Sequence, residues 1–239
     1  MHPKLSEVTS EADFDAIMPV LFRAFHSPYN SFSKFFNPIH TTLEAAIQDS
    51  KARQVAMWKG NQDCHWLKVT DAESGDVIGA ACWEVNATGY DKGGGSKKAF
   101  NASWHIEGSE EKLWAEKLIG GLKGFLKEKM TRPHLELDQL IVDPEHRRKG
   151  IGRMLINWGV KKADEMGVET VIESVPYAVP AYEHCGFECV EEVPLDFAIP
   201  NPSEKWEEWQ REDHRAYLMW RPVGKDYGEG DKTPWEKSG

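Results

Sequence analysis

Residues 135–174 constrain the fold of this chain more than any other stretch. An apolar run at 135–142 leads into a basic turn at 143–152, then into a helical pattern and a second apolar run at 168–174. Gly167 stands where a helix commonly ends. Two strands that are joined through a helix lie parallel in one sheet, with a right-handed connection. The stretch therefore predicts a βαβ unit within an α/β fold.

The turn inside this unit is rich in glycine and positive charge. Gly150 and Gly152 let a ligand approach the backbone closely, and the following helix points its N–H groups at the same place. Basic side chains concentrate there on an otherwise acidic chain: Arg147, Arg148, Lys149 and Arg153. We interpret the turn as a pyrophosphate cradle. The dinucleotide-binding glycine pattern fails at Leu155, which leaves a solvated charge cluster or a nuclear-localisation patch as the alternative.

The rest of the chain alternates short apolar runs with helical patterns. Strands are predicted at 4–9, 65–71, 76–85, 187–192 and 217–221, and helices at 11–25, 41–58, 109–130 and around Tyr182. Turn residues at 73–76 join two of the strands as an antiparallel hairpin. We expect one domain over residues 1–222, a mobile insertion at 87–98 and a disordered tail at 223–239.

Charge and hydropathy limit the partners of the chain. Its 239 residues carry a formal net charge of −10, which repels polyanions and favours cationic small molecules. We therefore expect no nucleic acid partner. No run of eighteen apolar residues and no signal-peptide pattern is present, so we expect no membrane partner. The expected location is the cytoplasm, with the nucleus left open.

The cysteines indicate neither a disulfide framework nor a metal site. Four cysteines are too few and too scattered for a framework in a chain of this length, so free thiols in a reducing compartment are expected. His184, Cys185 and Cys189 straddle a glycine turn into a strand, a placement that does not suit zinc. We therefore expect no metal.

Two motifs carry a resemblance to a known family. The first is Arg147-Arg148-Lys149-Gly150-Ile151-Gly152, and the second is Ala181-Tyr182-Glu183-His184-Cys185-Gly186-Phe187. Together they resemble the signature of the GNAT N-acetyltransferase superfamily. The resemblance covers residues 135–190 most closely. It implies an α/β (α+β) GNAT fold, with a mixed, mainly antiparallel twisted sheet flanked by helices and a central parallel strand pair that splays apart.

The resemblance also implies a function and a cofactor. The chain would be an acetyl-CoA-dependent N-acetyltransferase, without a metal, that moves an acetyl group to a primary amine of a small molecule or peptide. The alternative is a catalytically degenerate member that binds CoA or acetyl-CoA as a sensor or interaction module. The residues implied to bind the cofactor are Leu140, Ile141, Val142, Arg147, Arg148, Lys149, Gly150, Ile151, Gly152, Arg153, Ser174 and Tyr182. Ser174 stands near the place where many members have asparagine.

Four residues are implied to take part in the reaction. The N–H of Leu140 would face the thioester oxygen, and Tyr182 would protonate the leaving thiolate. Glu136 lies fourteen residues before Gly150, where some members place a glutamate base, and Asp138 is its neighbour on the same face of the strand. Either carboxylate, or water, would take the amine proton, and two close carboxylates raise the pKa of one of them. The structural alternatives are a packing tyrosine and ordinary strand carboxylates.

An aromatic segment is the candidate wall of the acceptor site. Residues 29–36 hold four aromatic side chains between turn formers, which is costly to expose without a use. By the resemblance, Tyr29 and Phe32 would bind the acceptor amine. The alternative is that these aromatic side chains cover the core. A monomer and a homodimer both fit the sequence.

Overall fold

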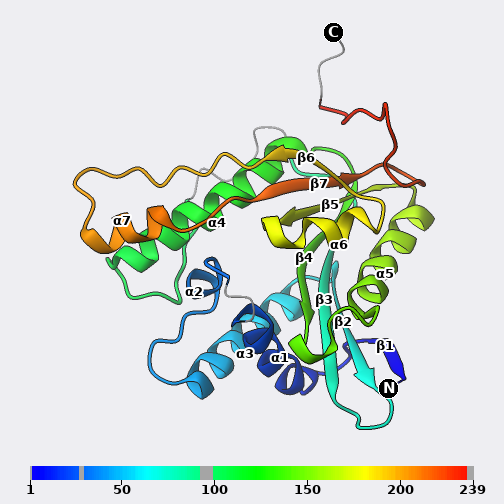
Figure 1. Cartoon of the computed structure of the whole chain (residues 1–239), viewed down its shortest axis with the longest axis horizontal. Coiled ribbons are helices and arrows are strands. Elements are labelled where there is room, and N and C mark those ends of the chain that lie inside the picture. Colours follow the sequence, from blue (N-terminus) through cyan, green and yellow to red (C-terminus); the bar gives the residue numbers. More distant parts are fainter. Residues whose placement is uncertain (1, 27–29, 92–98, 236–239) are drawn as a thin grey trace.

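A seven-stranded mixed sheet forms the centre of the computed structural model, which describes residues 2–26, 30–91 and 99–235 (Figure 1). The strand order is β1-β2-β3-β4-β5-β7-β6, and among these neighbours only β4 and β5 run parallel. The mixed, mainly antiparallel sheet that the sequence predicted is confirmed. The strands are β1 (Pro3–Glu7), β2 (Cys64–Asp71), β3 (Val77–Asn86), β4 (His134–Val142), β5 (Glu169–Ser174), β6 (Glu188–Glu192) and β7 (Tyr217–Arg221).

Helices cover both faces of the sheet, and local signals fix several of their ends. Thr42 and Ser109 each accept a hydrogen bond from a backbone N–H of the helix that follows. Gly167 ends its helix with a φ of 68°, a conformation that glycine adopts without strain. The helices are α1 (Asp13–His26), α2 (Ser33–Phe36), α3 (Leu43–Gly60), α4 (Glu110–Lys129), α5 (Ile151–Met166), α6 (Val179–Glu183) and α7 (Glu204–Arg211), with 3-10 turns η1 (Pro144–His146) and η2 (Pro176–Ala178).

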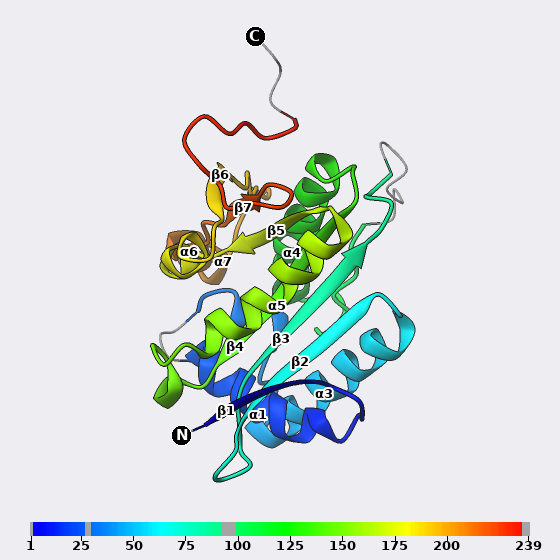
Figure 2. The same ribbon diagram turned by 90° about the vertical axis from the view of Figure 1, so that its right-hand side faces the viewer.

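The two faces of the sheet have separate cores. On one face, α5 lies alongside β3 and β4 and packs with α6 over Trp83, Leu137 and Ile172 (Figures 1 and 2). On the other face, α1 and α3 cover the half of the sheet around β2 and β3. Helix α4 covers the other half of that face, where Leu126 lies against Val171 and Trp220. The carboxyl ends of β4 and β5 lie between these layers.

Two helices escaped the sequence analysis. The aromatic segment at 29–36, for which the sequence predicted no helix, contains α2. Helix α7 lies between β6 and β7 and has only two apolar side chains, Trp206 and Trp209, which both pack against Trp114 of α4. Its remaining residues are polar, so no apolar periodicity marked it. The long β6–β7 connection is thereby attached to α4.

The structure describes only parts of the expected insertion and of the expected tail. Residues 92–98 of the expected insertion and residues 236–239 lie outside the described residues. Within the segment expected to be disordered, Tyr227 and Trp235 pack against Trp220. The domain boundaries stay a prediction. No helix in the described ranges is long and apolar enough to cross a membrane.

The parallel pair of strands separates early. β4 and β5 pair over four positions, from His134–Glu169 to Leu137–Ile172, and both strands continue beyond the last pair without pairing to each other. On its other edge, β4 stays paired with β3 through Val142, with Asp138 as an extra residue that makes a bulge. The predicted splayed parallel pair is confirmed. The gap beyond Leu137–Ile172 is called the strand gap below.

The contact between α5 and β3 gives a test of this packing. A Cβ atom at Gly159 would lie 2.2 Å from the ring of Trp83, far inside van der Waals contact. Gly159→Ala should therefore lower the free energy of unfolding by about 1–3 kcal/mol, as overpacking does. Gly124 of α4 is the matched control, because it is exposed and a Cβ there meets no atom within 4 Å. Gly124→Ala should be neutral or stabilising by up to about 1 kcal/mol in the same urea titration, and equal effects would contradict the packing.

Candidate active site

The turn between β4 and α5 is held in shape by Asp143. Its side chain accepts a hydrogen bond from the N–H of Glu145 at 3.0 Å and pairs with Arg23 of α1 at 2.7 Å. Burial alone would raise the pKa of Asp143, but the Arg23 guanidinium keeps that pKa below its usual value. Arg148 and Gly150 both have positive φ, at 57° and 84°. The chain thereby reverses direction and starts α5 with no side chain capping its first turn.

Space is left around the N-terminus of α5. A Cβ at Gly150 would meet no atom within 4 Å, and one at Gly152 would lie 3.7 Å from Val142. Uncapped N–H groups at a helix N-terminus, beside glycine, bind anionic groups such as a pyrophosphate. The predicted cradle is therefore open, and its donors come from the backbone of α5.

The basic side chains of the turn do not all face this space. Arg147 donates to the carbonyl of Ala24 at 2.6 Å and to that of Val142 at 3.3 Å, so it ties the turn to α1 and β4. Lys149 donates to a backbone carbonyl within the turn at 2.8 Å. Arg148 and Arg153 are exposed and remain the side chains that can meet a phosphate.

The strand gap exposes backbone groups of β4. The N–H of Asp143 donates to the carbonyl of Ile78, and bonding alternates along an antiparallel pair, so Ile141 also bonds to β3. Leu140 therefore directs its N–H and C=O groups away from β3, toward the strand gap, and Val142 directs its N–H there. The C=O of Val142 accepts the hydrogen bond of Arg147. The predicted backbone role fits these two residues. Ile141 does not share that direction, since its backbone groups bond to β3, and its side chain packs in the apolar cluster under α1.

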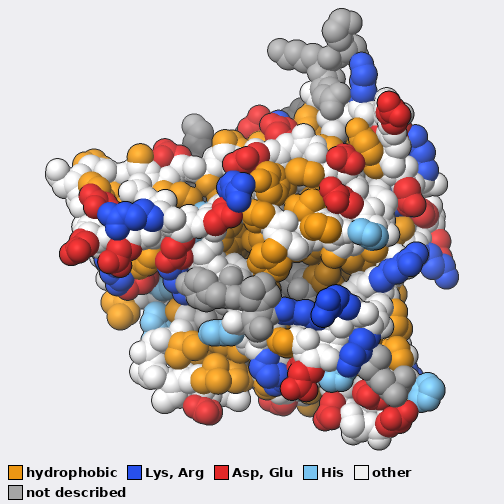
Figure 3. Space-filling view, viewed as in Figure 1, with side chains coloured by type: hydrophobic (Ala, Val, Ile, Leu, Met, Phe, Trp, Pro, Cys, Tyr) orange, Lys and Arg blue, Asp and Glu red, His pale blue; other side chains and the backbone are white. Residues whose placement is uncertain are grey.

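Tyr182 and Ser174 come from the segments that follow β5. Tyr182 is buried in the same apolar cluster that Leu140 and Val142 pack against, and its ring meets Phe187 edge-on. Burial raises the pKa of its phenol well above the usual value, so the hydroxyl keeps its proton. Ser174 is buried, and its hydroxyl donates to the carbonyl of the next residue at 3.0 Å. Figure 3 shows apolar side chains gathered over α6 and the ends of β4 and β5, beside basic ones.

A group of carboxylates lies under α4, beside the strand gap. We call its members the carboxylate group: Glu84 of β3, Glu136 and Asp138 of β4, and Glu173 of β5. Lys123 of α4 faces them, with its Nζ 3.9 Å from Asp138 Oδ1. The Tyr90 hydroxyl donates to Glu136 Oε2 at 2.7 Å. Among the described residues, Lys123 is the cation paired with this group.

Burial and mutual repulsion change the acidities in this group. Burial first, and then the charge of Asp138, raises the pKa of Glu136 to about 7 against the attraction of Lys123. Burial and the charge of Glu136 raise the pKa of Glu173 to about 8. The negative charge of Asp138 raises the pKa of Lys123, which stays an ammonium. The sequence predicted that Glu136 or Asp138 would have a raised pKa, and the structure extends this effect to Glu173.

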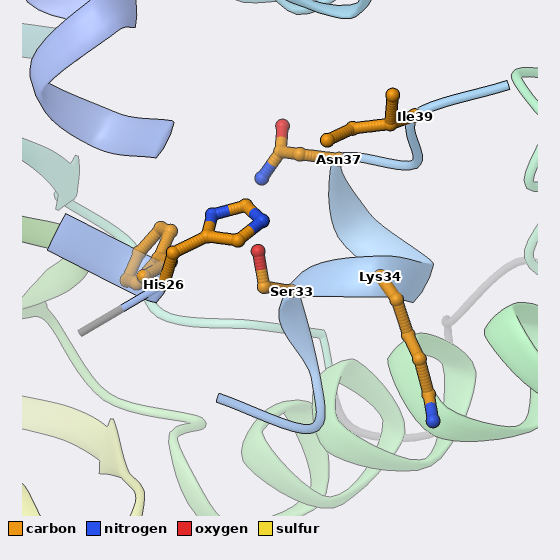
Figure 4. A pocket seen from close by; sticks show the side chains of 6 residues that line it. His26, Ser33, Lys34, Asn37 and Ile39 are labelled. Atoms are coloured by element: carbon orange, nitrogen blue, oxygen red, sulfur yellow. The ribbon is translucent and has the colours of Figure 1, made fainter. Parts of the chain in front are cut away.

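The aromatic segment is divided between the core and the undescribed residues. Tyr29 lies outside the described residues, whereas Phe32 is buried and stacks on His214 at 5.6 Å. This placement of Phe32 agrees with the alternative that the aromatics cover the core. Two polar residues of the segment, Ser33 and Lys34, belong to the lining of a hollow of about 210 Å³ (Figure 4). Its lining residues are Phe25, His26, Ser33, Lys34, Asn37 and Ile39.

Sequence reasoning missed Glu84, Tyr90, Lys123 and Glu173. Two of these residues had a signal, since Lys123 lies four residues after the buried Ile119 of α4 and Glu173 lies two residues after Val171 in an apolar strand. A charged residue at a core-facing position indicates a partner or a function. Tyr90 had no such signal, because it follows β3 in a loop and reaches Glu136 only through the tertiary fold.

The raised pKa of Glu136 predicts a pH-dependent stability. The folded protein holds a proton there that the unfolded chain releases near pH 4.5, so the contribution to stability is lost as the pH rises through about 7. Glu136→Gln, which stays neutral, should leave the melting temperature nearly unchanged at pH 5 and raise it by on the order of 5 °C at pH 8.5. Glu165→Gln, at an exposed carboxylate on α5, is the control and should give equal shifts at both pH values. A pH-independent shift for Glu136→Gln would contradict the raised pKa of Glu136.

Comparison with known proteins adds a family and a fold. The model of the acetyltransferase (GNAT) family matches residues 25–187 of this chain. Among curated proteins, none matches the chain in sequence. A structure described as histone acetyltransferase HPA2 and related acetyltransferase from Corynebacterium glutamicum is similar, with a TM-score of 0.55 and 18% identity over 93% of this chain and 97% of the other.

Two further solved structures are similar over most of their length. A mosquito arylalkylamine N-acetyltransferase-like 5b has a TM-score of 0.55 and 15% identity, covering 92% of this chain and 99% of the other. A phosphinothricin acetyltransferase of the GNAT superfamily from Sinorhizobium meliloti, in complex with AcCoA, has a TM-score of 0.51 and 16% identity, covering 96% of this chain and 95% of the other. At these identities the likeness shows the fold.

Proposed function

The chain belongs to the acetyltransferase (GNAT) family, and from this premise we propose that it transfers an acetyl group from acetyl-CoA to a primary amine of a small molecule or peptide. The observation that carries the proposal is the strand gap. β4 and β5 separate after Leu137–Ile172, so the N–H and C=O groups of Leu140 and the N–H of Val142 face it, next to the uncapped N-terminus of α5. Backbone groups of this kind need a hydrogen-bonding partner, and an extended amide-containing arm supplies one.

The residues of the cradle fit the phosphate end of acetyl-CoA. The first N–H groups of α5 would hold the pyrophosphate, since Gly150 and Gly152 leave room for it. The exposed Arg148 and Arg153 would add charge. Arg147 acts indirectly, because its guanidinium ties the turn to α1. Acetyl-CoA supplies the thioester whose acetyl group is transferred.

Two groups of this chain would stabilise and complete the transfer. The N–H of Leu140 would donate to the thioester oxygen as negative charge develops on it. Tyr182, whose phenol keeps its proton because it is buried, would protonate the departing thiolate. Its place in the apolar cluster that Leu140 and Val142 pack against supports this role.

A carboxylate beside the strand gap would take the proton of the amine. Glu136 and Asp138 are the candidate bases from the sequence analysis, and both belong to the carboxylate group under α4. The net negative charge of that group also favours an acceptor that arrives as an ammonium ion.

An amine panel tests the proposal. Tyramine, spermidine, glycine and a peptide with an N-terminal alanine would each be incubated with the protein and acetyl-CoA while thiol release is recorded. We expect turnover with at least one amine and binding of acetyl-CoA by isothermal titration. Binding without turnover would favour the sensor alternative. Absence of binding would contradict acetyl transfer altogether.

A charge reversal at the cradle tests the cofactor site. Gly152→Asp places a carboxylate where the pyrophosphate would lie, so the Kd for acetyl-CoA should rise by on the order of 100-fold through like-charge repulsion. Gly152→Ala is the control, because a Cβ there makes only an ordinary contact with Val142 at 3.7 Å. Both variants should melt near the wild-type temperature. Wild-type affinity in Gly152→Asp would remove the cradle from the proposal.

The role of Tyr182 is tested by removal of its hydroxyl alone. Tyr182→Phe keeps the ring in its apolar surroundings and should lower kcat by roughly 10- to 1000-fold while the Kd for acetyl-CoA stays nearly constant. The measurement is kcat against pH with the best amine of the panel. Wild-type turnover at every pH would return Tyr182 to a packing role.

A further inference from the structure

We propose that Glu173 of β5 is the residue that takes the proton from the ammonium group of the acceptor. This inference rests on the proposed acetyl transfer and assigns its base to a residue that neither family motif includes. It also gives the acceptor a class, a basic amine that is protonated at neutral pH.

The position of Glu173 along its strand is the first argument. Leu137–Ile172 is the last pair between β4 and β5, so Glu173 is the first residue of β5 beyond it. Glu136 pairs with Val171, and side chains alternate along a strand, so Glu173 lies on the same face of the sheet as Glu136. Helix α4 covers that face. Glu173 therefore stands at the point where the strand gap opens.

The other carboxylates of the group are engaged or farther away. Glu136 lies within the paired part of β4 and accepts the hydrogen bond of Tyr90 at 2.7 Å. Asp138 faces the ammonium of Lys123 at 3.9 Å. Glu84 belongs to β3, on the edge of β4 that points away from the strand gap.

Glu173 has a free oxygen as well as this position. Its Oε1 is buried and accepts no hydrogen bond from any residue in the described part of the chain. A buried carboxylate oxygen without a donor is costly, and an ammonium group is a strong donor for it. The residue as a whole is partly exposed, at the point where β5 leaves β4. The free oxygen therefore indicates a cationic ligand at the strand gap.

The charges around Glu173 set when it can act as a base. The groups that influence it are Glu136 and Asp138 from β4 and Lys123 from α4, and its pKa is raised to about 8, chiefly by burial and then by Glu136. The hydroxyl of Tyr90, which follows β3, donates a hydrogen bond to the Glu136 carboxylate. Near neutral pH, Glu173 is therefore partly protonated and becomes an effective base as the pH rises through about 8.

The step balances in atoms and charge. An N–H bond of the ammonium breaks and its proton goes to the Glu173 carboxylate. The freed nitrogen lone pair then forms the C–N bond at the thioester carbon, the C–S bond breaks, and the thiolate takes the proton of Tyr182. The acylated nitrogen still carries one proton more than the amide keeps, and it gives that proton to solvent. Solvent also receives the proton from Glu173 and returns one to Tyr182, so the net reaction of an ammonium releases one proton.

The test is a pH profile of kcat/KM for the best amine of the panel, with Glu173→Gln against wild type. In wild type, kcat/KM should rise with pH and level off above about 8, while the amine is still protonated. In Glu173→Gln it should fall about 100-fold at pH 8.5 and keep rising toward the pKa of the amine, since the amine must then lose its proton unaided. The KM for acetyl-CoA should not change.

Two further variants make the result specific. Glu165→Gln removes an exposed carboxylate on α5, outside the carboxylate group, and should keep the plateau within about twofold, as a distant substitution does. Glu136→Gln removes the charge that raises the pKa of Glu173, so it should move the rise to lower pH and keep its shape. A wild-type profile in Glu173→Gln, or loss of the rise in Glu136→Gln, would overturn the assignment while acetyl transfer stands. Inactivity of the wild-type chain with every amine would overturn both.

Discussion

The short pairing between β4 and β5 is the constraint on which the site depends. The two strands share only four paired positions, and β4 then remains with β3 while β5 remains with β7. The bulge at Asp138 adds bending to β4 just beyond the last pair. Helix α5, which connects the two strands in sequence, packs over the paired part. Polar backbone groups of Leu140 and Val142 are thereby left facing a gap next to a helix N-terminus.

The second constraint is electrostatic. Four carboxylates lie under α4 with one facing lysine among the described residues, an arrangement that costs stability unless protons are shared or a cation arrives. Helix α4 lies between β3 and β4 in the sequence, and its Lys123 faces this group. The same helix anchors α7 through Trp114. The helix that builds the core of this half of the molecule therefore also sets the acidity of the group beside the strand gap.

Local signals predicted most of the fold because they act within a few residues. The apolar runs around residues 135–174, the helices predicted at 41–58 and 109–130, and the helix end at Gly167 all appear as expected. Helix α7 did not, because two tryptophans on a polar helix acquire meaning only when Trp114 lies opposite them.

The candidate site was predictable in its backbone and less so in its side chains. The glycines and the first turn of α5 follow from sequence order. Arg147 was expected to face a ligand, yet its guanidinium holds the carbonyl of Ala24, a residue 123 positions away. Glu173 and Lys123 influence each other electrostatically because β5 and α4 pack on each other, a juxtaposition that no local pattern encodes.

Backbone amide chemical shifts, recorded by NMR while acetyl-CoA is added, test the central claim most directly. The account predicts that the amides of Leu140 and Val142 in the strand gap and of Gly152 in the cradle shift together at one Kd, while those of β1 at the far edge of the sheet do not. Saturable binding that leaves the Leu140 and Val142 amides unmoved would contradict it, because the cofactor would then lie outside the gap between β4 and β5.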